Sequence, residues 1–142
     1  MNWKRFCLAS LAAYIFVQAA DLLVNSVFMK SDVESYKELW RPNMTSRLWV
    51  MYVIGVLVAV LFTYIFVKGR EGKGVPEGIR YGLLIWLFVQ VPMSASMWVL
   101  LPISYRVMLK GLIYGLFETI VAGILVAVIY KPLAPAKAPV QP

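Results

Sequence analysis

Four long apolar runs dominate this sequence and limit what the chain can fold into. They lie at about residues 6–29, 48–68, 80–103 and 107–130. Each run is close to the roughly 20 residues that a helix needs to cross a hydrocarbon core of about 30 Å. Because lipid offers no partner for backbone N–H and C=O groups, each run is predicted to form a helix. Residues 1–131 are therefore expected to form an all-α bundle of four transmembrane helices, built from two helical hairpins.

The composition agrees with a membrane protein rather than a soluble domain. Of the 142 residues, 61% are hydrophobic and 15% are charged, whereas about 25% of the residues in soluble domains are charged. A soluble chain of this length has too little interior to hide so much apolar surface. A bilayer removes the difficulty, because lipid itself covers the apolar side chains.

The first outer loop is predicted to be structured. Val33, Tyr36 and Trp40 recur at helical spacing with charged residues between them, a pattern typical of a short amphipathic helix lying on a membrane surface. This interfacial helix is expected at about residues 32–40. The segment Ser31–Glu34 has the order of a capping box, which predicts that the helix starts there.

Basic residues set the expected orientation. Lys4 and Arg5, the loop 68–80 and the tail together carry eight Lys and Arg, against six on the opposite side. Because cytoplasmic loops are enriched in Lys and Arg, both termini are predicted to lie in the cytoplasm. The run at 6–29 is long for a signal peptide and is expected to remain as the first helix. The Pro- and Ala-rich tail, residues 132–142, is predicted to be disordered.

Missing residue types exclude several classes of protein. The chain has no His, and its single Cys is Cys7. It therefore lacks the usual ligands of haem, zinc and copper, and it cannot carry out disulfide exchange between paired cysteines. The net charge of +7 comes from residues at the ends of the apolar runs, which fits lipid headgroups rather than nucleic acid. We expect no metal, no cofactor, no nucleic-acid partner and no catalytic activity.

Polar residues at membrane depth form the candidate functional site. On the first helix, four of them are spaced 4, 3 and 4 residues apart, which places them on one face. Placing an unpaired polar group in hydrocarbon costs roughly several kcal/mol of free energy. This face is therefore predicted to point at polar residues of the third and fourth helices. The second helix is nearly pure hydrocarbon and is expected to lie outside this polar seam. The predicted seam consists of Tyr14, Gln18, Asp21, Asn25, Gln90, Ser94, Tyr114 and Glu118.

Two further patterns concern helix packing. Pro92 cannot donate a backbone hydrogen bond, so the third helix is expected to bend there. Gly111 and Gly115 form a small-xxx-small pair on the fourth helix, which favours close packing inside the chain over a dimer interface. The tripeptide Phe-Val-Gln occurs at 16–18 and again at 88–90, as it would in two hairpins related by duplication.

The polar seam supports two functions. As a hydrogen-bonded network that joins helices, it favours a non-enzymatic accessory subunit, or an assembly or structural factor, and this is the preferred interpretation. Alternatively, Asp21 and Glu118 bind a proton or cation in a small coupled transporter. The expected partners are the lipid bilayer and either other membrane subunits or a second copy of the chain.

Several segments resemble an uncharacterised family of small four-helix bacterial integral membrane proteins. They are Asp21-Leu22-Leu23-Val24-Asn25, Tyr36-Lys37-Glu38-Leu39-Trp40-Arg41-Pro42, Gly72-Lys73-Gly74, Glu77-Gly78-Ile79-Arg80-Tyr81-Gly82, Val91-Pro92-Met93, and Tyr114-Gly115 with Glu118. The resemblance covers most of residues 5–131 and implies a location in the bacterial inner membrane. It carries no activity to transfer. Such a family is expected to have His where this chain has Asn25, so a role for a titrating imidazole does not carry over.

Overall fold

The structure is a computed structural model that describes residues 1–130. Four of its helices are long and apolar enough to cross a membrane, and the described residues contain no strand, so the predicted all-α architecture is confirmed. The first span comprises α1 (Trp3–Leu23) and the π-helical turn η1 (Val24–Phe28), and the second comprises the 3-10 turn η3 (Met44–Arg47) and α3 (Leu48–Gly69). The third span comprises α4 (Val75–Ile85), the π-helical turn η4 (Trp86–Gln90) and α5 (Val91–Leu100). The fourth span is α6 (Tyr105–Ile129). The predicted disorder of residues 132–142 lies outside the described residues.

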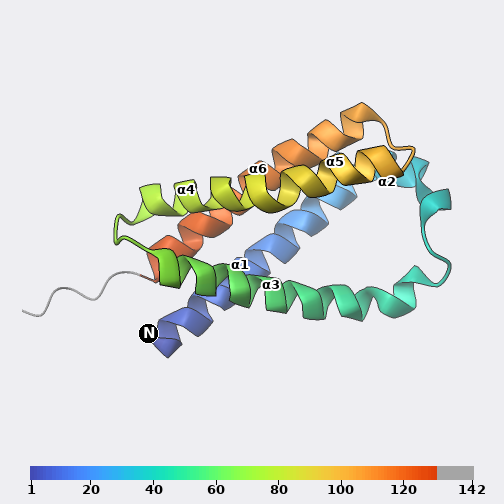
Figure 1. Ribbon diagram of the computed structural model, residues 1–142. Coiled ribbons are helices and arrows are strands. Elements are labelled where there is room, and N and C mark those ends of the chain that lie inside the picture. Colours follow the sequence, from blue (N-terminus) through green and yellow to red (C-terminus); the bar gives the residue numbers. More distant parts are fainter. Residues whose placement is uncertain (131–142) are drawn as a thin grey trace, which may run out of the picture.

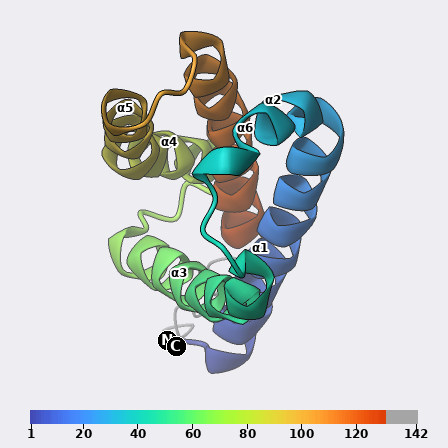
Figure 2. The ribbon, with the colours of Figure 1, turned by 90° about the vertical axis from the view of Figure 1, so that its right-hand side faces the viewer.

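Helix α6 lies between α1 and α4, and α3 packs on the other side of α1 (Figures 1 and 2). At the end of the bundle that holds the N-terminus, three helices share an apolar core. This core consists of Ala9, Ala13, Phe66, Val126 and Ala127. The small alanine side chains let the helices approach closely, so the bundle is tightest at this N-terminal end.

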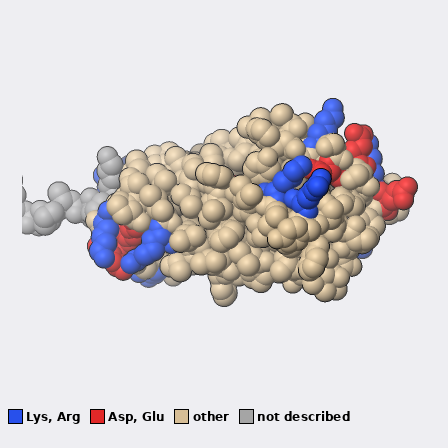
Figure 3. Space-filling model, turned by 90° about the horizontal axis from the view of Figure 1, so that it is seen from above, with Lys and Arg blue, Asp and Glu red and all other residues tan. Residues whose placement is uncertain are grey.

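Toward the opposite end, α3 diverges from α4 and α5 (Figure 1). Every residue from Trp49 to Ile54 is exposed, and Met51 reaches 67% exposure. Because consecutive helical residues point in all directions around the axis, no face of this six-residue segment of α3 packs against the rest of the described chain. Its apolar side chains need lipid or another protein around them. Figure 3 shows charged side chains gathered toward the two ends of one face of the molecule, with an uncharged belt between them.

Glycines bring α4 and α6 into backbone contact. A Cβ atom on Gly78 would lie 2.5 Å from the carbonyl oxygen of Gly123, and one on Gly82 would overlap the carbonyl oxygen of Thr119. Gly123 therefore packs inside the chain, against α4. Gly111 does not take part, because a Cβ atom there would meet nothing within 4 Å among the described residues. The close-packed pair is Gly78–Gly82 on α4, four residues apart on one face.

The third span contains a π-helical turn next to Pro92, where the sequence predicted a bend. Pro92 lies in the first turn of α5, directly after the π-helical turn η4. A π-helical turn accommodates the missing backbone donor of proline by widening the hydrogen-bonding pattern before it. The span starts at Val75 rather than near residue 80, because Pro76 suits the first turn of a helix and Gly74 adopts a positive φ of 71° just before it.

The loop between the first and second spans is helical, but it is divided in two. It contains α2 (Lys30–Ser35) and the 3-10 turn η2 (Lys37–Leu39). The predicted capping box is wrong: Met29 is the N-cap, and no side chain caps this helix. Because η1 runs almost directly into α2, the chain turns there without a polar residue at the cap. That this segment lies at a membrane surface remains a prediction.

Two contacts join this loop to the start of α6. Lys110 Nζ lies 2.6 Å from Asp32 Oδ2, and the Ser104 backbone N–H donates to the Tyr36 hydroxyl at 2.8 Å. The Lys110–Asp32 pair is partly buried, so it is less screened than an exposed ion pair. These contacts hold the loop after the first span against the loop before α6, while α3 diverges from α5.

The turn between α3 and α4 is ordered by two glutamates. Glu77 is buried at 6% exposure, and its carboxylate accepts the backbone N–H groups of Glu71 and Lys73. Glu71 is exposed and pairs with Lys73 Nζ at 2.5 Å and Arg80 Nη2 at 2.6 Å. Glu77 therefore binds the backbone of this turn, and Glu71 binds its basic side chains.

The charge of Glu71 predicts a pH effect at this turn. The hydrogen bonds from Lys73 and Arg80, and then the charges of the two cations, lower the pKa of Glu71 from 4.5 to about 2. Because the folded pKa lies below the unfolded one, the pairing stabilises the turn above pH 4.5 and is lost as the pH falls toward 2. In micelles, the side-chain carboxyl carbon of Glu71 should titrate in NMR spectra with a midpoint near 2. A midpoint near 4.5 would show that the pairs do not form.

Candidate functional site

The polar residues predicted on α1 form a stripe, and the two nearest the N-terminus, Tyr14 and Gln18, face α3. Measured from the position that a Cβ atom on Gly55 would take, Gln18 Nε2 and Tyr14 Cε2 both lie at 3.1 Å. The absence of a side chain on Gly55 thus makes room for both polar groups. This placement corrects the expectation that α3 lies outside the seam: its glycine, rather than a polar residue, receives them.

The other two residues of the stripe, nearer the C-terminal end of α1, are exposed. Asp21 and Asn25 are both solvent-accessible in the described chain. Asn25 Nδ2 donates to the backbone oxygen of Asp21 at 2.8 Å, so its amide is turned back onto its own helix. Within residues 1–130, the carboxylate of Asp21 has neither a hydrogen-bond donor nor a cationic partner.

The second carboxylate of the predicted seam belongs to Glu118 of α6. It is half-buried and lies on α6, which contacts α1. One turn away, the ring of Tyr114 packs on Phe28 of η1 at a centroid distance of 5.7 Å. A direct approach of Asp21 and Glu118 stays a prediction. Within residues 1–130, no Lys or Arg forms an ion pair with either carboxylate.

Both carboxylates lie in the inner part of their spans, away from the span ends. Taking 1.5 Å per residue from the middle of each span, Asp21 lies about 8 Å from the midplane and Glu118 within about 2 Å of it. The hydrocarbon core extends about 15 Å to either side of the midplane. A membrane crossed by these spans would therefore hold both groups inside its apolar layer.

The third span contributes less to the seam than expected. Gln90 lies against Gly115 of α6, with its side-chain atoms 2.9–3.0 Å from the position of a Cβ atom on that glycine. Ser94 is half-buried and makes no hydrogen bond within the described chain. Gln18 and Gln90, the two glutamines of the repeated Phe-Val-Gln tripeptide, thus each pack on a glycine of a neighbouring helix.

The seam is therefore a set of separate contacts rather than one network. Tyr14 and Gln18 pack on α3, Gln90 packs on α6, and Asp21 and Glu118 lie on the contacting helices α1 and α6. Among residues 1–130, no hydrogen bond joins one of the predicted seam side chains to another. The arrangement leaves a pair of carboxylates able to bind a proton or cation, or to accept donors from a further helix.

Sequence reasoning missed two buried hydroxyls near the core. Ser10 on α1 and Thr63 on α3 are buried at 6% and 0% exposure, and neither hydroxyl has a hydrogen-bond partner in the described chain. Thr63 lies four residues from Ala59, so helical spacing places both on one face of α3 and could have predicted that Thr63 is buried. The other residues of this face are small and apolar, so the sequence indicated a packing surface rather than a polar site.

Comparisons with protein-family models, with curated protein sequences and with solved structures gave no match. The described residues also contain no group of three or more His, Cys, Asp or Glu placed to hold a metal ion. The function is therefore argued from the geometry of the chain itself.

Proposed function

We propose that this protein is a multi-pass protein of the bacterial inner membrane that acts without catalysis, as a subunit or assembly factor of a larger membrane complex. The exposed carboxylate of Asp21 at membrane depth carries this proposal. The resemblance to small four-helix bacterial membrane proteins supports the location. The excess of Lys and Arg at the N-terminal end of the bundle supports a cytoplasmic position of both termini.

An exposed Asp inside the apolar layer is unfavourable when the chain is alone. Acidic residues within transmembrane segments almost always face a bundle interior or a water-filled cavity, because lipid solvates them poorly. Asn25 is exposed one turn further along the same face. A partner helix lying against this face would cover Asp21 and Asn25 and would donate hydrogen bonds to the carboxylate.

The chemistry of this face favours a different protein over a second copy. A two-fold interface through Asp21 would place one carboxylate opposite another, and like charges repel strongly in a medium of low dielectric constant. A helix that carries Ser, Thr, Asn, Lys or Arg would complement the face instead. Residues 49–54 of α3, all of them exposed, offer such a partner additional apolar contact.

One observation favours a second candidate, a small proton- or cation-coupled carrier. Asp21 and Glu118 lie on the contacting helices α1 and α6, and within residues 1–130 neither carboxylate has a hydrogen-bond donor or a cationic partner. A structural network would be expected to satisfy these groups. Carboxylates that bind and release a proton or cation need no permanent partner.

The double variant Asp21→Asn with Glu118→Gln separates the two functions. Both substitutions keep the size of the side chain and one acceptor oxygen, but they replace the other oxygen by an NH2 donor and remove the charge. For a subunit, the variant should reach the membrane and co-purify with the same partner proteins as wild type, with recovery within about twofold. For a carrier, the variant should lose proton- or cation-dependent flux in proteoliposomes. Loss of flux from a folded, monomeric variant would contradict the subunit proposal.

A further inference from the structure

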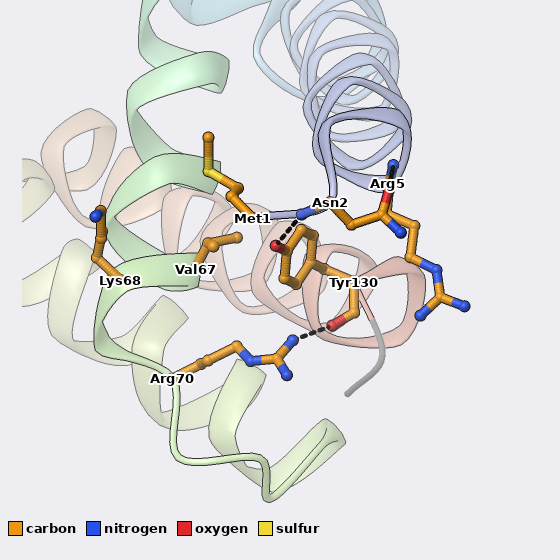
Figure 4. Close-up of a pocket in the computed structure, with 7 residues that line it drawn as sticks. All are labelled: Met1, Asn2, Arg5, Val67, Lys68, Arg70 and Tyr130. Atoms are coloured by element: carbon orange, nitrogen blue, oxygen red, sulfur yellow. Dashed lines mark hydrogen bonds between the residues drawn. The ribbon is translucent and has the colours of Figure 1, made fainter. Parts of the chain in front are cut away.

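At the N-terminal end of the bundle, the first span is fixed on the fourth. The backbone N–H of Asn2 donates to the Tyr130 hydroxyl at 3.0 Å, and Arg70 Nη1 donates to the Tyr130 backbone oxygen at 2.8 Å (Figure 4). Further along the two helices, Ala9 of α1 and Val126 of α6 belong to the shared apolar core. This end of the first span therefore has a fixed position against α6.

The opposite end of the first span packs far less. No residue of η1 is buried in the described chain, and Val27 and Phe28 are 62% and 52% exposed. The ring of Phe28 meets the ring of Tyr114 of α6 at a centroid distance of 5.7 Å. Directly after η1, Asp32 Oδ2 of α2 lies 2.6 Å from Lys110 Nζ of α6 (Figure 2). The ion pair thus joins the two elements where their apolar packing is sparse.

These contacts form a series along α6. Lys110, Tyr114 and Glu118 are spaced four residues apart, which places them on one side of the helix and about 12 Å apart from first to last. The facing segment runs in the opposite direction. Its Asp32 meets Lys110, and its Phe28 meets Tyr114 one turn further along. The ion pair and the ring pair therefore lie, in that order, between the end of the bundle and Glu118.

The π-helical turn η1 supplies a hinge for this end of the span. Asn25 Nδ2 donates to the backbone oxygen of Asp21 at 2.8 Å, and Ser26 Oγ donates to that of Leu22 at 2.5 Å. Side chains thus satisfy backbone oxygens at the point where the helical hydrogen-bonding pattern widens. Turns of this kind are common sites of bending in helices, because their backbone hydrogen bonds have a side-chain substitute.

We propose that α2 is a latch, which holds the end of the first span closed over Glu118 and releases it when the Lys110–Asp32 ion pair breaks. Release lets η1 bend, separates Phe28 from Tyr114 and opens Glu118 to water. The two side chains of the ion pair are 43% and 22% exposed. Such a pair suits a latch, because a fully exposed pair contributes little and a fully buried one is costly to break. The latch acts within one chain, so it is independent of the partner proposed above.

Spin labels on Val27→Cys and Ile113→Cys would measure this opening by double electron–electron resonance, in the full-length protein in lipid nanodiscs. Both positions are more than half exposed, and Cys7→Ser removes the one native thiol. Asp32→Asn should increase the population at the longer distance by about fivefold, the upper range for an ion pair that is not fully buried. Charge exchange, Asp32→Lys with Lys110→Asp, should restore the wild-type distribution. Failure of the exchange to restore it would overturn the ion pair as the latch.

Glu34→Gln is the matched control. Glu34 lies on the same short helix as Asp32 and pairs with Lys37 at 2.8 Å, but this pair joins α2 to η2 rather than to α6. Its loss removes the same charge from the same helix, and the distance distribution should match that of wild type. An equal response to Glu34→Gln and Asp32→Asn, or no response to either, would overturn the latch.

Access of water to Glu118 is the second measurement. In the Cys7→Ser protein, Glu118→Cys should react about fivefold faster with a water-soluble methanethiosulfonate when Asp32→Asn is added. An unchanged rate would show that the latch does not cover this position. If Asp32→Asn lowers the yield of folded protein, Tyr36→Phe takes its place. It removes only the hydroxyl that accepts the Ser104 backbone N–H at 2.8 Å, and it should move both measurements in the same direction.

Discussion

Replacing Gly82 with alanine should lower the free energy of unfolding by about 3 kcal/mol, because it forces α4 away from α6. The added Cβ atom would overlap the backbone of Thr119 and would lie 2.6 Å from the Cα atom of Ile120. Backbone atoms cannot rotate away as a flexible side chain can, so relief requires the whole helix to move. Unfolding in a titration from dodecyl maltoside to SDS, followed by helical circular dichroism, would measure the change.

Gly111→Ala is the control for this prediction. Gly111 lies on α6, the helix that Gly82 contacts, but a Cβ atom there meets no described atom within 4 Å. Its substitution should be neutral or slightly stabilising, since alanine favours a helix by up to about 1 kcal/mol over glycine. An equal loss of stability in both variants would mean that helix propensity, rather than the α4–α6 contact, controls the result.

Replacing Asp21 with leucine should have effects of opposite sign on the chain and on its complex. An Asp near the centre of a transmembrane helix costs about 3 kcal/mol more to insert than Leu, and somewhat less toward the ends. The isolated variant should therefore insert more completely, by about 2 kcal/mol in apparent insertion free energy. Recovery of partner proteins should fall at least tenfold, because the leucine accepts no hydrogen bond. Glycosylation-mapped insertion and quantitative co-purification would measure the two effects.

Leu23→Ala provides the comparison on the same helix. Leu23 is 54% exposed and lies about 160° around the helix axis from Asp21. Its truncation should leave partner recovery unchanged. If Asp21→Leu instead prevents accumulation of the chain in the membrane, Asp21 stabilises the fold itself and the proposed interface is wrong.

Periodicity and length were sufficient to predict the helices. Runs of about 20 apolar residues can satisfy their backbone in lipid only as helices, so the four spans followed directly from the sequence. The interruption before Pro92 was also predictable, because proline removes a specific donor. The π-helical turn η1 had no such signal, since Val24–Phe28 contains neither proline nor glycine.

Contacts between helices were harder to predict. The spacing of Tyr14, Gln18 and Asp21 showed that they share a face, but not which helix each would meet. Gly55 receives the first two, and a lone glycine in an apolar run carries no sign of its neighbour. For the same reason Gly111–Gly115 looked like the packing pair, although Gly78–Gly82 forms the backbone contact.

Photo-crosslinking in intact membranes tests the proposed interface most directly. A benzophenone amino acid at position 25 lies within about 40° of Asp21 around the helix, and one at position 23 faces away. We expect a protein adduct of one defined mass from position 25, lost in Asp21→Leu and retained in Asp21→Asn, and only lipid adducts from position 23. Lipid adducts alone from position 25, or an adduct with the mass of two copies of this chain, would contradict a partner helix from another protein.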